Sequence, residues 1–143
     1  MSYQWDVSAT WFDCNENGIG KGACGTCSWN QLGMAYPYLF GHPPNYARCS
    51  WFSTIPEMSC GDVVPVFSRC PGGPGWVNIP IVDHGPGRAC TCDLPVCYCE
   101  PYCNEENCAD LSIYRLIDLT KQAFLIMGRP LTEGKMFVSV RLP

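Results

Sequence analysis

The sequence predicts one mainly β domain that is held together by disulfides, and three observations support this. Its 143 residues suit a single domain with a proper hydrophobic core. The chain contains 14 glycines, 13 prolines and 13% aromatic residues, a composition typical of a compact β domain with many turns. Its 12 cysteines, an even number at high density, indicate a disulfide framework and therefore an oxidising environment.

Charge and hydropathy exclude two kinds of partner. The formal net charge is -4, and no two basic residues are adjacent. We therefore expect no nucleic-acid partner, because the sequence has no basic stripe to neutralise phosphates. No apolar run reaches the length of a transmembrane helix, so no membrane span is expected. We also expect no cofactor.

The first residues carry no visible export signal. Residues 1–6 include neither a basic segment nor an apolar one, so no signal peptide is predicted. We expect an extracellular or virion-associated protein, which leaves its cell either after removal of a signal or by lysis.

Several strand-like segments end at an aspartate. The segments with β-rich composition or alternating apolar residues are 7–12, 62–67, 76–82, 113–117 and 135–142. Asp13 follows the first, Asp83 follows the third and Asp118 follows the fourth. Such acids lie where side chains leave the core of a barrel or sheet and can meet a ligand, although aspartates are also common in turns.

A short helix is predicted directly after Asp118. Thr120 is a suitable N-cap, apolar residues recur at helical spacing up to Met127, and Gly128 suits the left-handed residue that ends a helix. Asp118 therefore lies at a strand-to-helix junction. The simpler alternative is that Asp118 only stabilises the positive end of the helix.

Two segments lack a periodic apolar pattern and are expected to be insertions. Residues 29–56 are rich in aromatic residues and proline, and they either line a carbohydrate groove or act as a substitute core under long loops. Residues 88–112 hold half of the cysteines, so we expect their order to depend on disulfides.

The cysteines also allow other interpretations. A zinc site could use Cys90, Cys92, Cys97 and Cys99 with His84, but their spacing is poor for structural zinc, and we favour disulfides without a metal. Residues 24–27 form a C-x-x-C motif without the βαβ context of a redox protein.

The order of the motifs resembles that in double-psi β-barrel proteins, which include expansins, barwin-like proteins and rare lipoprotein A. The matching segments are 10–12, 22–25 (Gly-Ala-Cys-Gly), 60–66, 82–86 and 117–124. The resemblance implies a six-stranded double-psi β-barrel with one or two short helices. It would occupy residues 1–143 as a single domain, with disulfide-tied insertions at about 29–56 and 88–112.

The same resemblance implies action on cell-wall polysaccharide, most directly peptidoglycan. A lytic transglycosylase or glycoside hydrolase would use Asp118 as general acid and Asp83 as the second polar residue of the groove, while Asp13 matches the base of related endoglucanases. The alternative is a non-catalytic wall-binding or structural module, such as a disulfide-stabilised part of a phage virion that contacts other virion proteins.

A glycan-cleaving groove needs an acid that protonates the leaving oxygen, and an apolar wall or a second carboxylate must raise its pKa. If Asp13 is the base, the carboxyl groups of Asp13 and Asp118 should lie ~6.5–9.5 Å apart. The candidate catalytic residues are Asp118, Asp83 and Asp13, and the candidate substrate-binding residues are Thr10, Trp11, Phe12 and His84.

Overall fold

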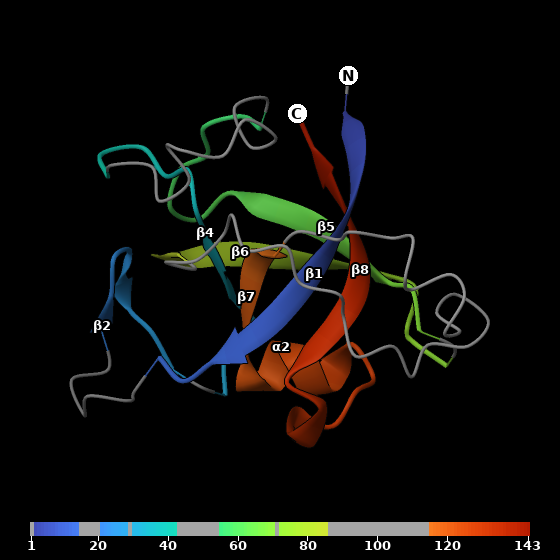
Figure 1. The fold of residues 1–143 in the computed structure, drawn as a ribbon. Coiled ribbons are helices and arrows are strands. Elements are labelled where there is room, and N and C mark those ends of the chain that lie inside the picture. The colour runs from blue at the N-terminus through green and yellow to red at the C-terminus, as the bar shows by residue number, and fades with distance from the viewer. Residues whose placement is uncertain (1, 15–20, 29, 43–54, 71, 86–114) are drawn as a thin grey trace.

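The computed structural model is a closed β-barrel of six strands (Figure 1). It describes residues 2–14, 21–28, 30–42, 55–70, 72–85 and 115–143. In their order around the barrel, the strands are β1 (Tyr3–Phe12), β7 (Arg115–Thr120), β4 (Met34–Tyr36), β6 (Trp76–His84), β5 (Val63–Ser68) and β8 (Lys135–Leu142). The pairs β1–β7 and β4–β6 are parallel, and the other four pairs are antiparallel. This closed mixed barrel confirms the predicted fold class.

In the parts of the chain that the structure describes, three short elements lie outside the barrel wall. They are the hairpin of β2 (Lys21–Gly22) and β3 (Gly25–Thr26), the helix α2 (Lys121–Ile126) and the 3-10 turn η2 (Leu131–Glu133). In Figure 1, α2 lies across one end of the barrel and the chain termini lie together at the other end. The termini are close because Tyr3 pairs with Leu142.

Strand β4, which the sequence analysis did not predict, corrects one interpretation. Residues 34–36 lie within the segment expected to be an insertion, but they form β4 between β7 and β6. Met34, Ala35 and Tyr36 are all buried, so this strand shows no alternation of apolar and polar residues. Residues 43–54 and 88–112, which make up much of the two expected insertions, lie outside the described residues.

The barrel interior is filled by the apolar residues that alternate along the longer strands. Side chains of β1, β5, β6, β7 and β8 interdigitate there, which fixes the register of each strand. The fully or nearly fully buried members include Val7, Ala9, Val64, Val66, Ile79, Ile81, Ile117, Leu119, Met136, Val138 and Val140.

Helix α2 begins and ends as the sequence predicts. The Thr120 side-chain oxygen accepts a hydrogen bond from the backbone N–H of Ala123 at 3.2 Å. Gly128 follows the C-cap with φ of 98°, the left-handed conformation that favours glycine. Ala123 and Phe124 are fully buried, so the helix closes one end of the core. No helix in the described parts of the chain has the length and apolar character needed to cross a membrane.

The described cysteines form disulfides, as expected. Cys14 pairs with Cys27 and Cys24 pairs with Cys60, and Cys70 is also disulfide-bonded. The two cysteines of the C-x-x-C motif therefore bond to different partners instead of to each other. They act as separate anchors of the β2–β3 hairpin.

Candidate functional site

A row of paired residues crosses four neighbouring strands of the barrel wall. Thr10 of β1 lies opposite Asp118 of β7, and Ala35 of β4 lies opposite both Asp118 and Asp83 of β6. Neighbouring strands are about 4.8 Å apart, so the backbones at Asp118 and Asp83 are separated by roughly 10 Å. The fold thus brings together three of the residues that the sequence selected.

Register shifts in the two parallel pairs create this row. Ser8 is opposite Arg115, but the next residue, Ala9, is opposite Ile117. In the same way, Met34 is opposite Ile81 while Ala35 is opposite Asp83. In each pair, one strand advances two residues where the other advances one. Such bulges redirect the side chains that follow them, and they are common beside functional sites.

Asp118 lies on the outer face of the wall and accepts a hydrogen bond from a threonine hydroxyl. Its neighbours Ile117 and Leu119 are fully buried in the core, so alternation along β7 directs the half-buried Asp118 outward. The hydroxyl of Thr10 donates a hydrogen bond of 2.7 Å to Asp118 Oδ1. The contact fixes one oxygen of the carboxyl group against β1.

Asp83 is held by the backbone. Its Oδ1 accepts hydrogen bonds from the N–H of Ala23 at 2.7 Å and from its neighbour His84 at 2.8 Å. The hairpin approaches so closely that a Cβ on Gly22 would lie 2.9 Å from Asp83 Cγ. Only glycine permits this approach. The Gly-Ala-Cys-Gly segment therefore positions Asp83.

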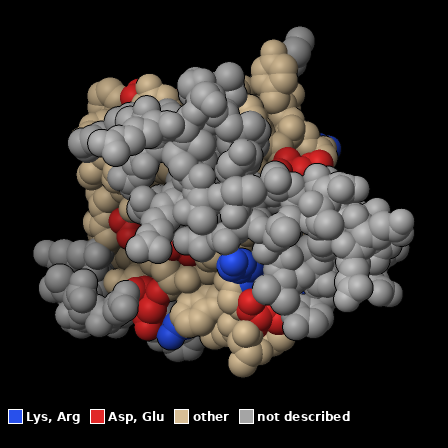
Figure 2. All heavy atoms as spheres, in the orientation of Figure 1, with Lys and Arg blue, Asp and Glu red and all other residues tan. Residues whose placement is uncertain are grey.

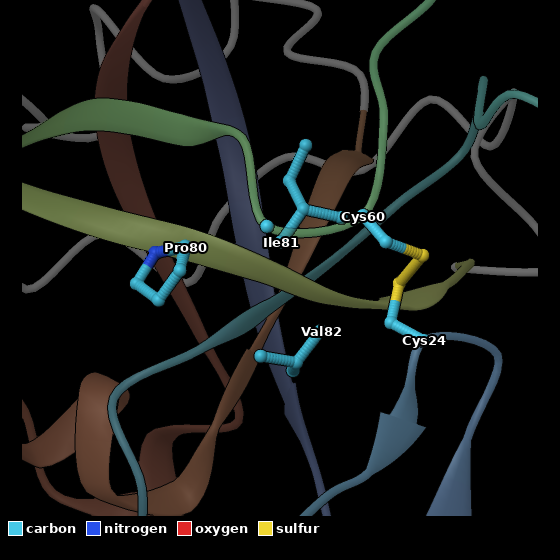
Figure 3. Close-up of a pocket in the computed structure, with 6 residues that line it drawn as sticks. Cys24, Cys60, Pro80, Ile81 and Val82 are labelled. Atoms are coloured by element: carbon cyan, nitrogen blue, oxygen red, sulfur yellow. A yellow bond between two sulfur atoms is a disulfide. The ribbon is translucent and has the colours of Figure 1, made fainter.

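A disulfide-lined cavity lies beside the hairpin. It has a volume of about 300 Å³, and Figure 3 shows the Cys24–Cys60 disulfide at its wall, joining the hairpin to the turn before β5. Its lining contains none of the three candidate carboxylates. The lining residues are Cys24, Cys60, Gly61, Pro80, Ile81 and Val82.

Asp13 belongs to a separate cluster where β1 meets α2. Its Oδ2 lies 3.1 Å from Nζ of Lys121, the first residue of the helix. The same ammonium group lies 5.3 Å from the centre of the Trp11 ring. In the view of Figure 2, the visible basic atoms of the described residues lie beside acidic ones. Asp13 therefore already has a cationic partner, which its sequence context did not reveal.

The two aromatic candidates lie on different faces of β1. Trp11 is opposite the buried Leu119, and its indole N–H donates to the Leu131 carbonyl at 2.8 Å. Alternation places Trp11 on the face away from Thr10 and places Phe12 on the same face as Thr10. Of the two aromatic rings, Phe12 therefore shares a face with Asp118.

The His84 ring contacts the segment that follows β4. Its Nε2 lies 3.2 Å from the Pro37 carbonyl oxygen, and its ring lies 5.0 Å from that of His42. Sequence analysis did not select His42, Ala23 or Lys121. The available signals were weak: His42 is one of only two histidines, and Ala23 belongs to a motif selected for its resemblance alone.

No protein-family model and no curated protein sequence matches the chain. Among solved structures, it is similar to a mutant expansin of Clavibacter michiganensis in complex with cellohexaose, with 15% identity and a TM-score of 0.48. That alignment covers 96% of this chain and 49% of the expansin chain, so this chain spans about half the expansin's length. The chain is also similar to the Streptomyces papain inhibitor, with 18% identity, a TM-score of 0.47 and coverage of 99% and 96%.

Because both scores are below 0.5, the fold assignment depends on the strand order and pairing of the barrel itself. These give the closed six-stranded barrel that the resemblance to expansins and barwin-like proteins implied.

Proposed function

We propose that this barrel acts on cell-wall polysaccharide, most directly on peptidoglycan, with Asp118 as the reacting acid. The observation that carries the proposal is the 2.7 Å hydrogen bond from Thr10 to Asp118 on the outer wall. Asp83 lies on β6, which is separated from β7 by the single strand β4. The small Ala35 of β4 lies between the two aspartates. A glycan chain lying across these strands would meet both carboxylates. The disulfides suit the extracellular location that such a substrate requires.

The partners of the other two carboxylates favour cleavage by one acid. A hydrolase that inverts the configuration at the anomeric carbon needs a second carboxylate to activate water. Asp13 is paired with Lys121, and Asp83 Oδ1 accepts two backbone hydrogen bonds. In a lytic reaction, Asp118 gives its proton to the glycosidic oxygen while the C–O bond breaks. A hydroxyl of the same sugar then attacks the anomeric carbon, and its proton returns to Asp118.

A second candidate function is binding without cleavage, as in a wall-binding or structural module of an extracellular protein or a virion. The same hydrogen bond supports it, because Asp118 Oδ1 serves as acceptor to Thr10. An ionised carboxylate in this role can accept sugar hydroxyls, and no proton transfer is needed.

Incubation with purified peptidoglycan sacculi separates these functions. We expect the native protein to release soluble muropeptides that end in an anhydro sugar, in which a hydroxyl is joined to the anomeric carbon of the same ring. Asp118→Asn should abolish release while the variant still sediments with sacculi, and the exposed Glu57→Gln should behave as the native protein.

The other outcomes are also decisive. Unchanged release by Asp118→Asn would end the catalytic role of this residue. Sedimentation without release by the native protein would support binding alone. Neither binding nor release would refute both functions.

A further inference from the structure

We propose that the loop after β4 and the end of β6 form a stacking subsite for sugar rings, made by Phe40 and His42 of the loop and by His84 of β6. The inference depends on the proposed action on polysaccharide. It assigns to that function a second contact region beyond the carboxylates of the wall.

The side chain of Phe40 is exposed to solvent, while its backbone is fixed by hydrogen bonds. Its side chain is 69% exposed, the largest exposure among the large apolar residues that the structure describes. Its N–H donates to the Met58 carbonyl at 2.8 Å, and the Met58 N–H donates to Tyr38 at 3.0 Å. The intervening Leu39 pairs with Met58 and is fully buried. The phenyl ring is therefore exposed on a fixed backbone, so it can offer a face to a ligand without ordering of the main chain.

The two histidines provide a second flat surface where the loop after β4 meets the end of β6. They are the only histidines of the chain, and their rings lie 5.0 Å apart with an interplanar angle of 37°. The contact between His84 Nε2 and the Pro37 carbonyl fixes one ring. The Gly85 N–H donates to the Tyr36 carbonyl at 3.2 Å, which ties the end of β6 to the start of the loop.

The backbone of His84 connects this surface to the carboxylate row. His84 follows Asp83 and donates its backbone N–H to that carboxylate. A glycan lying across Asp118 and Asp83 would reach the imidazoles as it leaves β6 at this end of the barrel. The ligand class follows from the chemistry: carboxylates bind sugar hydroxyls, and ring faces pack against the apolar C–H face of a pyranose.

The subsite should therefore recognise chain length. Short fragments can occupy the carboxylate row alone, while longer ones also cover the loop. We expect Phe40→Ala to weaken binding of long soluble peptidoglycan fragments about tenfold, with little effect on disaccharides. Phe40→Trp should retain the affinity, because it keeps a ring face.

The experiment is a binding titration of the native protein and each variant with fragments of increasing length. Leu125→Ala is the matched control, because it removes another exposed apolar side chain, 45% exposed, from helix α2. Equal melting temperatures would show that Phe40→Ala leaves the fold intact. His42→Ala should lower the affinity for long fragments in the same direction.

Three results would overturn the subsite. If the native protein binds long fragments and Phe40→Ala binds them equally well, the subsite is wrong while the proposed function stands. If the native protein binds no fragment of any length, the proposed function fails and the subsite fails with it. A loss of affinity in Phe40→Ala that is equal for disaccharides and long fragments would also contradict it.

Discussion

The two parallel strand pairs of the barrel each present an aspartate, but different groups hydrogen-bond its carboxylate. In β1–β7 and in β4–β6, a register shift precedes an aspartate, Asp118 in the first and Asp83 in the second. Asp118 is held by the hydroxyl of Thr10 from the neighbouring strand. Asp83 is held by backbone N–H groups, one from its own strand and one from a separate hairpin.

This difference separates a reacting group from a fixed one. A hydroxyl can donate or accept, so the partner of Asp118 can follow a change in the protonation of the carboxyl group. A backbone N–H can only donate, so Asp83 Oδ1 is restricted to the role of acceptor. The hairpin that supplies this donor is anchored by Cys14–Cys27 and Cys24–Cys60. The comparison therefore predicts chemistry at Asp118 and positioning at Asp83.

The largest expected effect is the contrast between amide substitutions at the two aspartates. Asp118→Asn should reduce muropeptide release at least about 100-fold, because an amide cannot act as a general acid. Asp83→Asn should reduce it by no more than about tenfold, because the amide oxygen still accepts both N–H bonds. Rates of release from sacculi test this. Equal losses at the two positions would contradict the division of roles.

Removal of the disulfide beside Asp83 should have the next largest effect. The double change Cys24→Ala and Cys60→Ala should lower the free energy of unfolding by about 2–4 kcal/mol. Because Ala23 is adjacent to Cys24, loss of the disulfide should also speed the amide exchange of Ala23. The exchange of Leu119, which lies in the β1–β7 pair, should change less. Denaturant titration and amide hydrogen exchange measure the two effects. Unchanged exchange at Ala23 would show that the hairpin holds Asp83 without the disulfide.

A methyl group on Gly22 should disturb Asp83 directly. The new Cβ would lie 2.9 Å from both Asp83 Cγ and the Val82 carbonyl oxygen, so the hairpin or the strand must move. We expect Gly22→Ala to cost about 1–3 kcal/mol of stability, as other overpacking changes do. Ala23→Ser, at an exposed neighbour, should change stability by less than about 0.5 kcal/mol. Thermal unfolding of both variants provides the comparison.

The smallest effect is expected at Thr10. Thr10→Val keeps the shape of the side chain but removes the donor to Asp118, which should cost about 1 kcal/mol of stability. Thr10→Ser keeps the hydroxyl and should retain muropeptide release. If Thr10→Val releases muropeptides at the native rate, the hydrogen bond does not orient the acid.

The sequence predicted the features that depend on local chemistry. The helix after Asp118 was readable because its cap, its apolar spacing and its terminal glycine are all set within a few residues. The long strands were readable from their alternation, and the even cysteine count indicated disulfides. Asp83 and Asp118 could be selected from their places at the ends of predicted strands, whereas Thr10 was selected only through the resemblance to a known family.

Only the tertiary structure decided how those residues meet. The strand β4 is three residues long and entirely buried, so it has no periodic signal, yet Ala35 joins the two aspartates across it. The register shifts that align Asp118 with Thr10 and Asp83 with Ala35 depend on pairing between strands that are distant in the chain. Local sequence determines which residues can form a strand, but register is fixed by the packing of the whole barrel.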